Sequence, residues 1–108
     1  MIVCVPVQPD GTVDPRWGRA QRIAVAEVRD GEIARWDEVE VGWDHLHDEG
    51  SSARHHARVA RFLREQGVEA VVATHVGDGM VRMLDTMHLT LHVGAAGDAR
   101  TAVTAALA

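Results

Sequence analysis

Histidine is unusually frequent in this chain of 108 residues, which contains seven of them. Five fall within one stretch of sequence: His45, His47, His55, His56 and His75. Histidine is the commonest protein metal ligand, and a neutral imidazole suits zinc, copper, nickel or iron. A transition-metal site is therefore the first chemistry that the sequence suggests.

The spacing of the first four histidines favours some of them as ligands. His45 and His47 are separated by one residue, and in an extended segment this spacing points both imidazoles to the same side. His55 and His56 are adjacent in a predicted helix, where neighbours diverge by about 100° and cannot both reach one ion. His56 falls in the predicted apolar stripe of that helix and His55 falls outside it, so His56 is the favoured ligand.

His75 ends a nearly continuous apolar run at residues 68–75, which is typical of a strand covered on both faces. Open α/β sheets bind ligands at the carboxyl ends of their strands. The sequence therefore predicts a metal site made of His45, His47 and His75, with His56 as a fourth ligand. A buried histidine with one structural hydrogen bond is the alternative interpretation of His75.

Two glycines follow, at the predicted start of a helix. Gly77 and Gly79 leave backbone N–H groups free for an anion or for the sulfide or oxide of a metal cluster, although a tight turn alone would also explain them.

Cys4 alternates with valines in the first predicted strand, so we expect a buried thiol that binds no metal. Three methionines of the later helix recur at helical spacing, which is more typical of a packed core face than of soft-metal ligands.

Apolar patterning predicts the elements that position these residues. Strands are predicted at residues 2–7, 21–29, 32–41, 68–75 and 89–93, and helices at 52–66, from the glycine turn to about 87, and from 98. Asp30-Gly31 is a strong hairpin signal between the second and third strands. Residues 42–50 are predicted to be a polar loop. We expect an α/β domain, with a five-stranded mixed sheet and about three helices on its two faces.

The composition is that of one globular domain spanning residues 1–108, with 46% hydrophobic and 25% charged residues. No apolar run is long enough to cross a bilayer, and no positively charged leader precedes the first strand. The single cysteine excludes an internal disulfide and fits a reducing compartment. At a net charge of −5 the chain lacks the basic stripe that nucleic acid needs. We expect a cytoplasmic protein without membrane or nucleic-acid partners, and an oligomer is left open.

Several segments, taken in order, resemble one known family. Residues 3–7 form a strand ending in Pro-Val, and residues 13–20 (VDPRWGRA) are similar to a segment of the type S-P-H-F-G-R-A. Residues 68–74 (VEAVVAT) are similar to V-D-V-V-I-x-G and lead to a glycine-bearing turn. The chain thereby resembles the dinitrogenase iron–molybdenum cofactor-binding family over nearly its whole length. The resemblance implies a ribonuclease-H-like fold, a role in carrying or assembling metal clusters, and cluster-donor or cluster-acceptor proteins as partners.

Two positions depart from the pattern of that family. Arg16 stands where the family has a histidine, and Thr74-His75 replaces its usual double glycine. Trp17 takes the family's aromatic position and would form part of the wall of a cofactor site. These differences imply the same fold with a different metal ion or metal–sulfur cluster.

Three functions are open at this point. The leading hypothesis is a non-catalytic metal or metallocluster binder that acts as a carrier, chaperone or scaffold. The second is a small metalloenzyme with an open coordination position, using Asp44, Asp48, Glu49 or Asp78 as acid or base. The third, a ribonuclease-H-like nuclease, is disfavoured because it needs clustered carboxylates, and Asp10 has no comparable partner on a later strand.

Overall fold

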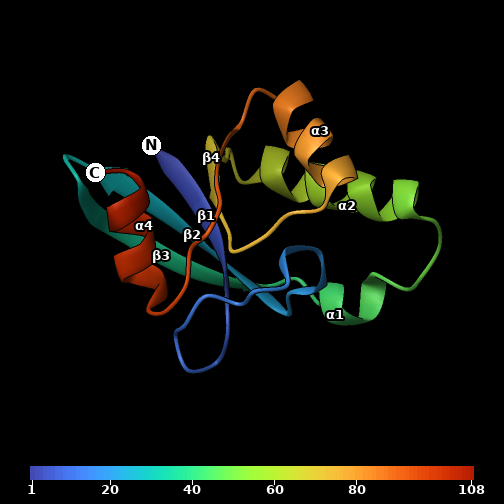
Figure 1. Ribbon diagram of the computed structural model, residues 1–108, viewed down its shortest axis with the longest axis horizontal. Coiled ribbons are helices and arrows are strands. Elements are labelled where there is room, and N and C mark those ends of the chain that lie inside the picture. The colour runs from blue at the N-terminus through green and yellow to red at the C-terminus, as the bar shows by residue number, and fades with distance from the viewer.

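A five-stranded mixed sheet forms the centre of the protein, and the computed structural model describes all 108 residues (Figure 1). The strands are β1 (Ile2–Val7), β2 (Arg22–Arg29), β3 (Glu32–Glu40), β4 (Ala70–Val72) and β5 (Thr90–His92). The helices are α1 (Trp43–Leu46), α2 (Ser52–Glu65), α3 (Asp78–Thr86) and α4 (Ala99–Ala106), with a 3₁₀ turn, η1, at Trp17–Arg19. The predicted α/β class and mixed five-stranded sheet are confirmed.

The strands follow the order β3-β2-β1-β4-β5, which is compatible with the expected ribonuclease-H-like fold. β1 is antiparallel to β2 and parallel to β4, and β4 is parallel to β5. β2 and β3 form an antiparallel hairpin that turns at Asp30 and Gly31, whose φ angles are 55° and 76°. A two-residue turn with both φ angles positive matches the twist of the strands, so the hairpin predicted from Asp-Gly is confirmed.

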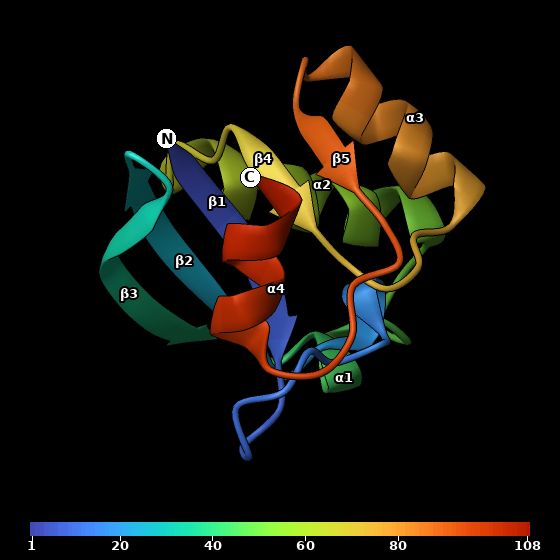
Figure 2. The same ribbon diagram turned by 60° about the vertical axis from the view of Figure 1, so that its left-hand side comes forward.

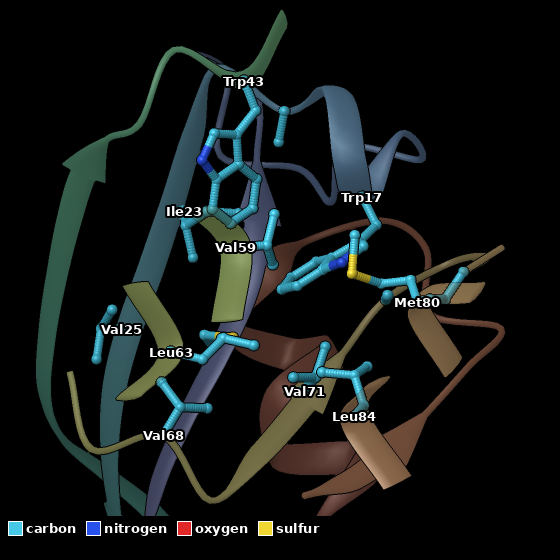
Figure 3. Packing of buried hydrophobic residues seen from close by; sticks show 14 residues of the cluster. Trp17, Ile23, Val25, Trp43, Val59, Leu63, Val68, Val71, Met80 and Leu84 are labelled. Atoms are coloured by element: carbon cyan, nitrogen blue, oxygen red, sulfur yellow. The ribbon is translucent and has the colours of Figure 1, made fainter. Parts of the chain in front are cut away.

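Helices cover both faces of the sheet: α2 and α3 lie on one face, and α4 lies on the other (Figures 1 and 2). Successive side chains of a strand point to opposite faces, so β1 contributes to two separate cores. Cys4 packs in the core beneath α2 and α3 with Leu63, part of which Figure 3 shows. Val5 packs in the core beneath α4 with Val103.

The segment predicted to be a polar loop, residues 42–50, contains the short helix α1. Trp43 at its start is only 2% exposed and packs edge to face on Trp17, with ring centroids 5.6 Å apart. Four residues are too few to display a helical period in the sequence, so burial of one tryptophan, and not patterning, creates this element. The protein consequently has four α-helices where about three were expected.

β4 pairs over three residues, although the apolar run that predicted it covers 68–75. The run is longer than the strand because Val68 and Ala73 are buried in the core beneath α2 and α3 while lying outside β4. The apolar run therefore predicted the buried residues correctly, but it predicted a longer strand than the one that pairs in the sheet. No helix of the chain is both long and apolar enough to span a membrane.

Candidate functional site

A cavity of about 410 Å³ opens beside η1 and the first turns of α2 and α3. Four histidines contribute to its wall: His47, His55, His56 and His75. A larger hollow of about 560 Å³ lies between β5 and α4, but its wall is mostly apolar, and His92 is its only titratable side chain. The cavity with the four histidines is therefore the candidate site.

Three of the four predicted metal ligands line this cavity: His47, His56 and His75. His45 does not line it, and its side chain is 87% exposed beside Asp44. The pairing of His45 with His47 assumed an extended segment, whereas α1 is helical, and helical residues two positions apart do not face each other. His75 is exposed in the cavity wall, so it is not a buried structural histidine.

The histidines share a cavity wall without forming a compact ligand set. No group of three or more His, Cys, Asp or Glu side chains is arranged so that it could hold a metal ion. The thiol of Cys4 is fully buried, as predicted, and burial raises its pKa. Gly77, Gly79 and Trp17, the predicted cofactor-binding residues, all line the same cavity as the histidines.

His55 is the histidine that α2 buries. It is 3% exposed and lies in line with Val59 and Leu63 on the core face of the helix. The prediction that His56 lies in this stripe and His55 outside it is therefore wrong. Val59 comes three residues after His56 and four after His55, and both spacings place side chains on one helix face. The apolar pattern alone could not separate the two histidines.

Both ring nitrogens of His55 are engaged. Nε2 lies 2.8 Å from the carbonyl oxygen of Gly18, and an N–H of the Arg58 guanidinium donates to Nδ1 at 2.8 Å. Since a guanidinium can only donate, Nδ1 accepts, and Nε2 carries the proton that it donates to Gly18. The ring is neutral, in line with burial, which lowers the pKa of His55. His55 therefore positions the η1 turn and has no nitrogen left for a metal ion.

Arg58 fixes a second segment of the wall, because its guanidinium also donates to the carbonyl oxygen of Leu46 at 3.0 Å. α2 thus holds η1 through His55 and holds α1 through Arg58. His47, just after α1, packs edge to face on His55 with ring centroids 5.0 Å apart. Its Nδ1 lies 3.2 Å from a carboxylate oxygen of Asp48, which leaves Nε2 of His47 for a ligand.

The first turn of α3 presents backbone donors at the cavity. Gly77 is the N-cap and supplies no side-chain acceptor to the first N–H groups of the helix. A Cβ placed on Gly79 would lie 2.9 Å from Cε1 of His56, so the glycine allows the imidazole to lie against this turn. Free N–H groups at the positive end of a helix dipole form a binding position for an anion.

Two arginines complete the cavity wall. Arg16 pairs with the buried carboxylate of Asp14 through Nε at 3.2 Å and Nη2 at 3.3 Å, and this hydrogen-bonded pair raises the pKa of Arg16. Arg19 lies 3.4 Å from the exposed carboxylate of Asp48. Asp78 is the only carboxylate in the wall. The cavity is therefore rich in N–H donors and imidazoles.

The sequence profile of the family described as dinitrogenase iron-molybdenum cofactor matches residues 1–108. The chain belongs to this family. Solved structures with a similar fold include PH0822, at 17% identity and a TM-score of 0.77, covering 99% of this chain and 89% of that one. The apo form of the orange protein from Desulfovibrio gigas follows, at 21% identity and a TM-score of 0.76, covering 98% and 86%. A NifB-like protein from Thermotoga, TM1290 of the DUF35 family, has 22% identity and a TM-score of 0.70, covering 96% and 84%. These likenesses establish the fold, and no curated protein matches the sequence.

This member of the dinitrogenase cofactor family carries Arg16 where the similar family segment has histidine. A guanidinium has no lone pair to give to a metal, but it forms strong, directional hydrogen bonds to anions. Sequence reasoning missed the pairing of His55 with Arg58. The signal that could have revealed it is their spacing of three residues near the start of a helix, which places both side chains on one face.

Proposed function

We propose that this chain carries a preassembled, anionic metal–sulfur or metal–oxo cluster in the cavity formed by η1, α2 and α3. The observation that carries the proposal is the composition of the cavity wall. Two guanidinium groups, the first N–H groups of α3 and several imidazoles surround the cavity, with one carboxylate and no thiol among them. Membership of a family described by a metallocluster supports a cargo of this kind.

The wall suits a cluster better than a single metal cation. A bare cation needs three or four close ligands, and no group of three such side chains is arranged to hold one. The sulfide or oxide atoms of a cluster accept hydrogen bonds. A hydrogen bond from a charged donor such as arginine to an anion is stronger than one between two neutral groups. His47, His56 and His75 would then bind peripheral metal atoms through neutral nitrogens. His45 stays outside the proposed site because it does not line the cavity.

We propose a carrier or scaffold in preference to a metalloenzyme. Three carboxylates considered as acid or base, Asp44, Asp48 and Glu49, lie outside the cavity wall. Asp78 lies in the first turn of α3, where a negative charge stabilises the helix. A general base must lie within hydrogen-bonding reach of its substrate, and of these four carboxylates only Asp78 lies in the wall. Cluster-donor and cluster-acceptor proteins in a reducing cytoplasm would be the partners of such a carrier.

Titration of protein purified without an affinity tag tests this function. The probe is tetrathiomolybdate, an anionic metal–sulfur ion, with Zn²⁺ as the comparison cation. We expect the anion to bind, and we expect Arg19→Ala and His75→Ala each to weaken binding at least about tenfold, or roughly 1.4 kcal/mol. His88→Ala is the matched control, because His88 is exposed and lies outside the wall. Equal affinities for all variants, or binding of zinc alone, would contradict the proposal.

A further inference from the structure

The indole nitrogen of Trp17 is the only buried side-chain nitrogen or oxygen of the chain without a hydrogen-bond partner. Trp17 is 3% exposed and lines the candidate cavity. Buried polar groups in proteins are almost always paired, and an unpaired donor lowers the stability of the fold. This N–H group therefore has a function to be explained, and it lies beside a cavity proposed to hold an anion.

Met80 shares both the buried core and the cavity wall with Trp17. The close-up draws the sulfur of Met80 over the nitrogen edge of the indole (Figure 3). Its terminal Cε lies 4.0 Å from the position of a Cβ on Gly18, the neighbour of Trp17. A thioether is only a weak acceptor, and the indole N–H has no hydrogen-bond partner although Met80 lies nearby.

The two side chains differ in their freedom to move. Trp17 is held by Trp43 in an edge-to-face contact with ring centroids 5.6 Å apart, and His55 fixes the carbonyl of Gly18 beside it. Met80 is unbranched, has three rotatable bonds and adapts easily to a change in its surroundings. Rotation of Met80 would therefore open a path from the cavity to a tryptophan that stays in place.

We infer that the Nε1–H group of Trp17 is a hydrogen-bond donor to the cargo, and that Met80 is a movable cover over it. This inference rests on the proposed function and adds a hydrogen-bond donor that the proposed function did not use. The N–H group and the first turn of α3, which carries Met80, would bind the anion from two sides. Binding would thus exchange an unpaired buried donor for a charge-assisted hydrogen bond.

Indole N–H signals in a ¹⁵N–¹H NMR spectrum test the contact directly. The chain has three tryptophans, and Trp17→Phe identifies the signal of interest. On titration with tetrathiomolybdate, we expect the Trp17 signal to move downfield. The signal of Trp36 should stay in place, because Trp36 packs against the core beneath α4. Binding that leaves the Trp17 signal unmoved overturns this inference alone, whereas absence of binding overturns the proposed function as well.

Affinities of variants test the donor and its cover separately. Trp17→Phe should weaken tetrathiomolybdate binding at least about tenfold, and Trp36→Phe is the matched control. Met80→Ala should speed hydrogen exchange of the Trp17 indole. Met83→Ala, which loses the same side chain outside the cavity wall, should leave this exchange rate unchanged. The comparison is made on variants that fold. Equal affinities for the two tryptophan variants, or equal exchange rates for the two methionine variants, would overturn the inference.

Discussion

Replacing Gly79 with alanine should separate cargo binding from stability. Within a helix, alanine is favoured over glycine by about 1 kcal/mol. The new Cβ would lie 2.9 Å from Cε1 of His56, so the imidazole must rotate, at a cost of about 0.5–1.5 kcal/mol if it leaves a favoured rotamer. The two effects nearly cancel. We expect the free energy of unfolding to change by less than about 1 kcal/mol, while His56 is displaced from the cavity wall.

Urea denaturation and tetrathiomolybdate titration would measure the two quantities. The affinity of Gly79→Ala should fall about tenfold, which corresponds to roughly 1.4 kcal/mol. In a His56→Ala background the clash is absent, so Gly79→Ala should there add about 1 kcal/mol of stability and leave affinity unchanged. An equal loss of affinity in both backgrounds would refute the reasoning, because displacement of His56 could not then be its cause.

The free energy of unfolding should fall as the pH drops below about 6.5, because burial lowers the pKa of His55 and the unfolded chain then binds the proton more tightly. The stabilisation that depends on neutral His55 is fully present above about pH 6.5. Urea unfolding across this range would show the slope, and His55→Gln should reduce it; an unchanged slope would assign it to other groups. Asp98→Ala should cost about 1 kcal/mol, because Asp98 caps α4 by accepting from N and Oγ1 of Thr101, both at 2.9 Å. Asp85→Ala, an exposed change near the end of α3, is the control for that unfolding measurement. Cys4 should react with a thiol reagent only after unfolding, since it is fully buried; rapid modification of the folded protein would show that β1 opens.

Local signals account for the parts of the fold that the sequence predicted well. Asp30-Gly31 adopts two left-handed φ angles, a conformation that few residue pairs allow, so the β2–β3 hairpin was readable without knowledge of the rest. The helix start near residue 52 was equally readable, because Ser51 accepts a hydrogen bond from the backbone N–H of Arg54. Apolar patterning within each segment likewise predicted β1 and β2.

The site was only partly predictable, because side-chain direction there depends on tertiary contacts. His75 and the glycine turn follow β4, where the rule for parallel strands expects a ligand. The position of His45 depends on α1 being helical, which in turn depends on burial of Trp43. The choice between His55 and His56 depends on which side of α2 meets the sheet. No local pattern encodes either contact.

The hydrogen bonds that α2 makes to its two neighbouring segments have a consequence for motion. His55 holds the carbonyl of Gly18 in η1, and Arg58 holds both the carbonyl of Leu46 in α1 and the ring of His55. Loss of the first turns of α2 would therefore release η1 and α1 together. Local openings in proteins occur as contiguous cooperative units, so amide exchange should show these three segments opening as one. Entry and exit of the proposed cargo would then be governed by a single opening equilibrium, and not by independent movements of separate loops.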